Sequence, residues 1–165
     1  MESKKTAGGH EMLIPSFTWT SVNVGIFRTI DDLEYALSRL PIGRTWDKSL
    51  AFTIQPFKTL DLVTIRPRLY EKQKAKMSRL EICQLGVRLG LEECPQEVGP
   101  QLLIQGKAER NIEEVLIAST EPMGGRKDVG LTISQRFGPF WLNSYVDPEE
   151  GWNTDTVWVF VKPRG

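Results

Sequence analysis

The residue pattern changes at Cys94-Pro95: from there on, short strand-like segments are separated by turn residues. This pattern restricts the folds that the chain can adopt. Apolar residues alternate strictly in residues 129–133 and occupy both faces in residues 157–161, which is typical of a central strand. Glycine, proline and aspartate separate the segments, as turns require. The spacing predicts a five-stranded antiparallel meander or partly open barrel. The predicted strands are residues 101–105, 113–120, 128–134, 139–146 and 156–163.

The chain before Cys94 carries two helix patterns, at about residues 30–40 and 79–90. Thr29 is a suitable N-cap for the first helix. Ser78 and Glu81 form the S-x-x-E capping box that predicts the start of the second helix. Gly86, within that second pattern, indicates close approach to a neighbouring element. Strand patterns precede and separate the helices, at residues 22–27, 49–54 and 59–66.

These patterns predict an α+β protein with one domain. We expect a flexible tail in residues 1–15 and a single domain in residues 16–165. Within that domain, residues 16–95 form a mixed α/β lobe and residues 96–165 an antiparallel β lobe. The two lobes are expected to share a core, because a half of about 80 residues buries too little surface to be stable alone.

Charge and composition exclude several classes of function. The 21 basic and 21 acidic residues give a net charge of zero, which argues against a general nucleic-acid binder. No apolar run approaches the length of a membrane span, and the N-terminus lacks the pattern of a secretory signal. We therefore expect a cytoplasmic protein with reduced thiols and no membrane partner. Of the two thiols, Cys94 is the more exposed candidate, since it precedes a proline in a loop.

Histidine and cysteine are too scarce for most catalytic or metal sites. The single histidine, His10, lies in the polar tail, so a Ser-His-Asp or Cys-His arrangement is not expected. Two cysteines, eleven positions apart, do not make a zinc site. We predict no metal, no cofactor and no catalytic residue, and favour a protein that is not an enzyme.

The sequence around residues 94–102 is similar to a known motif. It reads Cys-Pro-x-Glu-Val-Gly-Pro-x-Leu, and Trp141-Leu142 and a terminal Trp158-Val159-Phe160 follow it. In this arrangement the chain resembles a family of uncharacterised bacterial proteins, over about residues 42–162. The resemblance implies a bacterial origin and one co-folding unit, and it implies no activity. The chain departs from the family pattern around residues 106–125.

Two regions are candidates for ligand binding. The first is the loop from Cys94 to Pro100, whose prolines could hold Glu97 as a preorganised carboxylate. The second is a set of aromatic, amide and guanidinium side chains in the C-terminal part, which suits stacking on sugars or bases. Each region has a simpler interpretation, as a rigid connector and as core residues respectively. The candidate binding residues are Glu97, Arg126, Arg136, Trp141, Asn143 and Trp152.

The leading hypothesis is a binding or protein-interaction module without catalytic activity, whose C-terminal β region contacts another protein or a second copy of the chain. The alternative is a small hydrolase or transferase that uses carboxylates, with Glu97 or Glu121 in a cleft. A third hypothesis is a nucleic-acid accessory protein that uses a local basic run. That run comprises Arg66, Arg68, Lys72, Lys74, Lys76 and Arg79.

Overall fold

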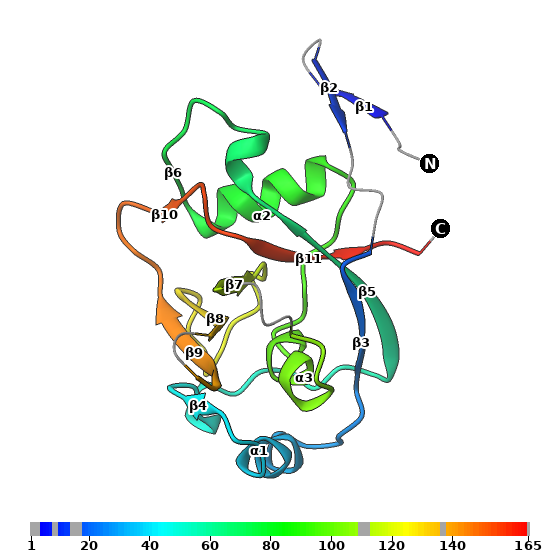
Figure 1. Ribbon diagram of the computed structural model, residues 1–165, viewed down its shortest axis with the longest axis vertical. Coiled ribbons are helices and arrows are strands. Elements are labelled where there is room, and N and C mark those ends of the chain that lie inside the picture. Colours follow the sequence, from blue (N-terminus) through cyan, green and yellow to red (C-terminus); the bar gives the residue numbers. More distant parts are fainter. Residues whose placement is uncertain (1–3, 8–9, 14–17, 109–112, 136–137, 165) are drawn as a thin grey trace.

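A large curled sheet organises the chain, and strands from both predicted lobes contribute to it (Figure 1). The computed structural model describes residues 4–7, 10–13, 18–108, 113–135 and 138–164. Within these residues seven strands form one sheet, in the order β3-β5-β11-β7-β8-β9-β4. Their bounds are β3 Thr20–Val24, β4 Gly43–Arg44, β5 Lys58–Ile65, β7 Glu114–Ile117, β8 Val129–Gln135, β9 Phe140–Val146 and β11 Trp158–Lys162. The predicted α+β class is confirmed.

The predicted five-stranded antiparallel meander is wrong in two respects. Only β7, β8 and β9 follow one another as antiparallel neighbours, and β11 lies between β5 and β7 instead of beside β9. The sheet is also mixed, because β11 pairs with β7 in parallel and with β5 antiparallel. The apolar residues on both faces of β11 explain its position, since residues 158–161 are all buried in the middle of the sheet.

Both predicted helices are confirmed, and each begins at the expected cap. In α1 (Ile30–Ser38) the Thr29 side chain accepts a hydrogen bond from the backbone N–H of Asp32, at 3.1 Å. In α2 (Arg79–Arg88) Ser78 and Glu81 form the reciprocal capping box. At Gly86 an added Cβ would lie 2.0 Å from the Phe160 ring of β11, so this glycine does allow the close approach that the sequence indicated.

The predicted strand at residues 101–105 is wrong, because this segment belongs to a third helix. In α3 (Val98–Ile104), Pro100 lies in the first turn, where its missing N–H is not needed. The helix lies inside the curl of the sheet, and its first six residues are buried. Its one polar residue, Gln101, is buried with the rest and marks no exposed face, so this short, mostly apolar segment resembles a strand.

The predicted strand at residues 49–54 is also wrong. A short 3-10 helix, η1 (Lys48–Leu50), is followed by extended chain that is not part of the sheet. The N–H groups of Thr53 and Gln55 donate to the carboxylates of Glu121 and Glu97 instead of to a neighbouring strand. Side chains distant in sequence therefore replace the strand partner here.

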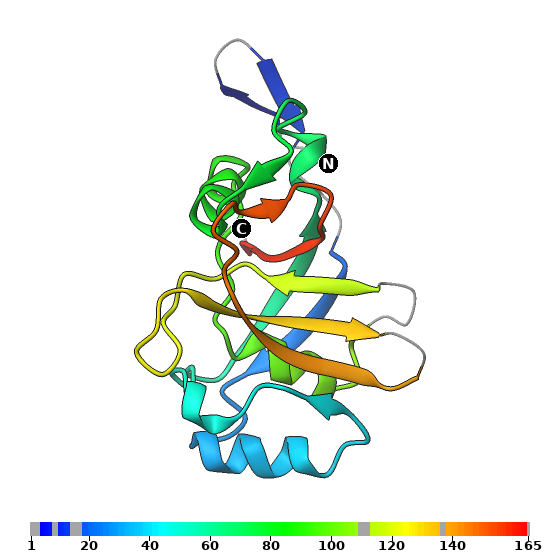
Figure 2. The ribbon, with the colours of Figure 1, turned by 90° about the vertical axis from the view of Figure 1, so that its left-hand side faces the viewer.

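Two hydrophobic clusters pack on the two faces of the sheet. The concave face packs against α1 and α3, and its buried residues include Val22, Leu62, Leu131 and Val159. The opposite face packs against α2, through residues such as Leu116 and Trp158. Figure 2 shows the sheet curling between α2 on one side and α1 on the other.

The remaining short elements lie outside the large sheet. Residues 4–7 and 10–13, within the predicted tail, form the antiparallel hairpin of β1 (Lys4–Ala7) and β2 (His10–Leu13). β6 (Lys76–Met77) pairs with β10 (Trp152–Asn153), and a 3-10 helix, η2 (Pro67–Leu69), follows β5. Among the described residues, no helix has the length and apolar character needed to cross a membrane.

Candidate functional site

Aromatic and amide side chains share one face at the β9 end of the sheet. Because side chains alternate along a strand, Trp141, Asn143 and Tyr145 of β9 point to the same side. Asn143 pairs with Thr132, and Thr132 pairs with Leu116 of the α2-side cluster, so this is the α2 side of the sheet. We call the surface formed by Trp141, Asn143, Tyr145 and Trp152 the aromatic face.

The Trp141 indole lies flat against the backbone of the neighbouring edge strand. β4 pairs with β9 in parallel, and Gly43 is the direct partner of Trp141. A Cβ built on Gly43 would lie 2.3–2.5 Å from three adjacent atoms of the indole, so any other residue would displace the ring. Trp141 nevertheless remains 40% exposed. One side of the indole ring therefore packs against Gly43, and part of the residue is accessible to a binding partner.

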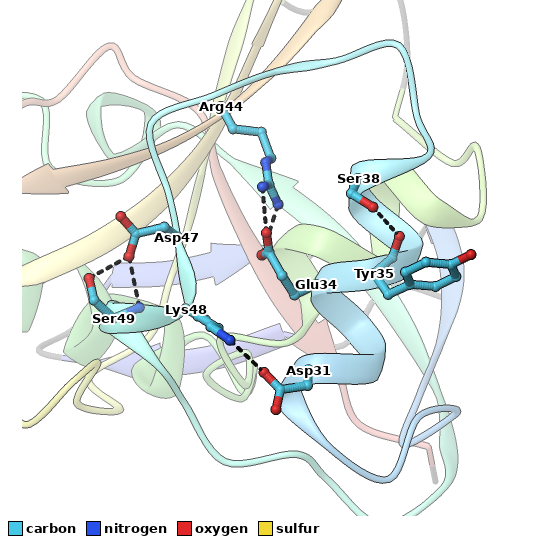
Figure 3. A network of polar contacts seen from close by, with 8 residues as sticks. All are labelled: Asp31, Glu34, Tyr35, Ser38, Arg44, Asp47, Lys48 and Ser49. Atoms are coloured by element: carbon cyan, nitrogen blue, oxygen red, sulfur yellow. Dashed lines mark hydrogen bonds and ion pairs between the residues drawn. The ribbon is translucent and has the colours of Figure 1, made fainter.

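Contacts with α1 hold β4 in the position that supports this indole (Figure 3). The Arg44 guanidinium donates to both carboxylate oxygens of Glu34, at 2.9 and 2.5 Å. Lys48, after β4, forms an ion pair with Asp31 in the first turn of α1, at 3.0 Å. The backbone N–H groups of Thr45 and Trp46 also donate to the carbonyl of Leu142. The half-buried Arg44–Glu34 pair therefore adds to the backbone bonds of this short edge strand, whereas the exposed Lys48–Asp31 pair contributes little.

A row of hydrogen bonds crosses the aromatic face and uses the polar groups of Asn143. The Thr45 hydroxyl donates to Oδ1 of Asn143 at 3.3 Å, and Nδ2 of Asn143 donates to the Ser134 hydroxyl at 3.1 Å. Thr45 also accepts from the backbone N–H of Ser144, at 3.0 Å. Asn143 itself is buried, with 7% exposed. The row therefore stiffens the face rather than offering a free amide to a ligand.

Trp152 closes the other end of the aromatic face. Its ring packs edge-to-face against Tyr145 and Trp158, with centroid distances of 6.3 and 5.7 Å. Its Nε1 donates to Asp147 at 3.1 Å. Asp147 also accepts from the guanidinium of Arg79, at 2.5 Å. Trp152 is consequently half-buried over the edge of the α2-side core, while Trp158 is a core residue.

Arg79 is a residue whose role sequence reasoning missed. It was grouped with the basic run, yet it is only 5% exposed and fills the space above Gly130. It donates to the carbonyl of Val129 at 2.6 Å and forms an ion pair with Asp147. Within the same run, Arg68 pairs with Asp155, and Lys74 pairs with Glu81. The basic run is therefore partly neutralised by local carboxylates.

Glu97 lies apart from the aromatic face, and its carboxylate acts as a clamp, by which we mean that it links separate segments of the chain through hydrogen bonds. It is completely buried, and its carboxylate accepts three hydrogen bonds. The donors are the backbone N–H of Gly25 at 2.7 Å, the backbone N–H of Gln55 at 2.8 Å and Nε2 of Gln101 at 3.0 Å. Three donors from three separate segments converge on one carboxylate, which suits a structural role.

Glu121 makes a second clamp nearby. Its two oxygens accept from the backbone N–H groups of Thr53 at 3.1 Å and Gln96 at 2.8 Å. Glu121 and Glu93 line a cleft with a volume of about 360 Å³ beside Cys94. Glu93 accepts from both the N–H and the hydroxyl of Thr120, at 2.6 Å each. The cleft contains carboxylates, as the alternative hypothesis requires; those of Glu93 and Glu121 are engaged by backbone donors, while the exposed Glu92 also lines the cleft.

Both cysteines are buried. The expectation that Cys94 is the more exposed thiol is wrong, because its residue is 2% exposed and its Sγ contacts the carbonyl of Val159. Burial raises the pKa of the Cys83 thiol to about 12 and that of Cys94 well above its usual 9.0. Thiols of this kind are poor nucleophiles at neutral pH.

The two candidate arginines do not join the aromatic face. Arg126 lies in the turn before β8, where its guanidinium pairs with Asp128 at 3.1 and 2.9 Å. This hydrogen-bonded pair lowers the pKa of Asp128 below its usual value. Arg136 lies outside the described residues. Of the six candidate residues, the structure brings together Trp141, Asn143 and Trp152.

Comparisons of the chain with protein-family models, with curated proteins and with solved structures found no match.

Proposed function

We propose that this chain is a protein-binding module that contacts its partner through the aromatic face. The observation that carries the proposal is the Trp141 indole, which lies flat on Gly43 with 40% of its surface exposed. Tyr145, on the same face, is 38% exposed. Tryptophan and tyrosine are enriched among the residues that dominate binding energy at protein interfaces.

The rigidity of the face favours a protein partner over a sugar. Binding of a sugar needs polar side chains that are free to exchange hydrogen bonds with its hydroxyl groups. Here the Thr45 hydroxyl already donates to Oδ1 of Asn143, and Nδ2 of Asn143 donates to the Ser134 hydroxyl. A rigid aromatic surface whose buried amide is already paired loses little entropy when a complementary protein surface covers it.

The state of the acidic residues and thiols also supports binding over catalysis. The Glu97 and Glu121 carboxylates accept backbone hydrogen bonds, and the two thiols have raised pKa values. A general acid or base needs an oxygen within reach of substrate, and Glu97 is completely buried. We therefore place Glu97 in the architecture of the fold and not in a reaction.

Affinity capture from a bacterial lysate tests the proposal, with the purified chain as bait and mass spectrometry of the bound proteins. Trp141→Ala removes the exposed indole, and Phe57→Ala is the matched control because Phe57 is an exposed aromatic residue away from this face. We expect a protein that the wild type and Phe57→Ala retain and that Trp141→Ala loses at least tenfold.

Light scattering on the same three proteins covers the case in which the partner is a second copy. A dimer that Trp141→Ala dissociates would support the proposal for that partner. Equal capture by Trp141→Ala and wild type, or a wild type that stays monomeric and retains nothing, would refute it.

A further inference from the structure

A second feature, on the opposite side of β9, is a cavity of about 410 Å³. It lies between the end of α1, the helix α3 and the start of β9. Phe140 lines it, whereas the next residue, Trp141, belongs to the aromatic face. The described lining residues are Leu40, Pro41, Ile42, Leu102, Leu103, Gly106, Ala108, Gln135, Gly138, Pro139 and Phe140.

The chemistry of the lining restricts what the cavity could hold. None of the described lining residues is charged, and most are aliphatic. Nε2 of Gln135 already donates to the carbonyl of Gly138, at 3.1 Å. Among the described lining residues a charged ligand would find no group of opposite charge, and the one buried polar atom without a partner is the uncharged Oε1 of Gln135. An apolar molecule would instead replace water at the partly exposed side chains of Leu40, Ile42 and Phe140.

The rim of the cavity is built from residues with little or no side chain. Gly106 ends α3 with a φ of +64°, and Gly138 precedes β9 with a φ of +143°. A Cβ built on either glycine would meet nothing within 4 Å. Pro41 and Pro139 complete the described rim with short, rigid side chains. Among the described residues, the two glycines therefore leave open space beside the cavity.

We propose that this cavity is a binding site for a small, uncharged, apolar molecule. Its volume falls in the range of known ligand pockets, about 300–1,000 Å³, and apolar cavities of roughly 150 Å³ already bind a single ring. The site is independent of the proposed protein interface, because it lies on the other face of β9 and shares no residue with the aromatic face.

Methyl NMR of the full chain with indole as the probe tests the proposal. The methyl groups of Leu40, Ile42, Leu102 and Leu103 all line the cavity. We expect their signals to shift saturably as indole is added, approaching saturation below about 5 mM, since a ligand of this size binds weakly. Tryptamine, a cationic relative of indole, should bind at least tenfold more weakly.

Two variants locate the binding. Ala108→Trp places a large ring in the cavity and should weaken indole binding at least tenfold, and Leu103→Phe is a smaller filling substitution if Ala108→Trp fails to fold. Val87→Trp is the control, because Val87 is exposed on α2. Absence of saturable shifts in the wild type, or equal shifts in the filled variant and the control, would overturn the proposal.

Discussion

Replacing Glu97 with glutamine should destabilise the fold strongly, although the change alters only one atom of the side chain. The carboxylate accepts from Gly25 and Gln101 at Oε2 and from Gln55 at Oε1. In glutamine one of these oxygens becomes an NH₂ group, which would face an N–H donor. If the NH₂ group takes the place of Oε1, the bond from Gln55 is lost. If it takes the place of Oε2, the bonds from Gly25 and Gln101 are both lost, which costs more.

The size of the effect follows from the bonds that are lost. A hydrogen bond to a charged group contributes about 1.5–3 kcal/mol, and a buried unpaired donor adds a further penalty of about 1–3 kcal/mol. We therefore expect Glu97→Gln to lower the free energy of unfolding by about 2.5–6 kcal/mol. In urea the midpoint should fall by about 1–3 M if the slope is about 2 kcal/mol per M.

Urea denaturation followed by circular dichroism measures this change. The control is Glu92→Gln, because Glu92 is exposed and should change the unfolding free energy by less than about 0.5 kcal/mol. If Glu97→Gln were as stable as the control, the clamp argument would be refuted. A stable Glu97→Gln protein would also restore Glu97 as a candidate for the carboxylate enzyme hypothesis.

Three further predictions concern the core and its charges. Because both thiols are buried and have raised pKa values, neither Cys83 nor Cys94 should be alkylated by iodoacetamide at pH 8 in the folded protein. Both should react when the chain is unfolded in guanidinium. The measurement is mass spectrometry of the labelled chain, and a modified thiol in the folded protein would contradict the prediction. Gly86→Ala should lower the unfolding free energy by about 1–3 kcal/mol in urea, because overpacking against the ring of β11 outweighs the gain in helix propensity. A hydrogen bond from Arg164 holds the pKa of Asp61 below its usual 3.8, so this carboxylate adds stability that is complete above about pH 4 and is lost as the pH falls through the lowered pKa. Asp61→Asn should flatten this part of the stability curve in urea titrations between pH 5 and 2, and an unchanged curve would contradict the assignment.

Local signals predicted the elements that depend on local bonds. The caps at Thr29 and Ser78 located both surface helices, because each side chain satisfies backbone groups within three residues. The apolar faces of β11 likewise predicted its central place. These features need no knowledge of the rest of the chain.

The elements that sequence reasoning missed depend on partners far along the chain. The backbone of the segment after η1 bonds to Glu97 and Glu121, which are 42 and 68 positions away from their partners. The helix α3 is buried inside the sheet over its first six residues, so apolar and polar positions do not alternate with a helical period that the sequence could show.

The candidate site likewise has one part that the sequence could predict and one part that depends on contacts between distant residues. Residues 141, 143 and 145 share a face because strand side chains alternate, and the sequence could predict that much. The support of Trp141 by Gly43 arises from a parallel pairing between residues distant in sequence. The burial of Arg79 depends on Gly130 leaving space above the sheet. Neither of these contacts has a local sequence signal.

The most direct measurement uses Gly43→Ala, which keeps every aromatic residue but places a methyl group where the Trp141 indole now lies. The variant is compared with the wild type and with Trp141→Ala by quantitative capture, after circular dichroism has verified its fold. We predict that Gly43→Ala loses the same bound protein as Trp141→Ala. Capture at the wild-type level by Gly43→Ala would contradict the claim that the indole, held flat on β4, is the centre of the binding surface.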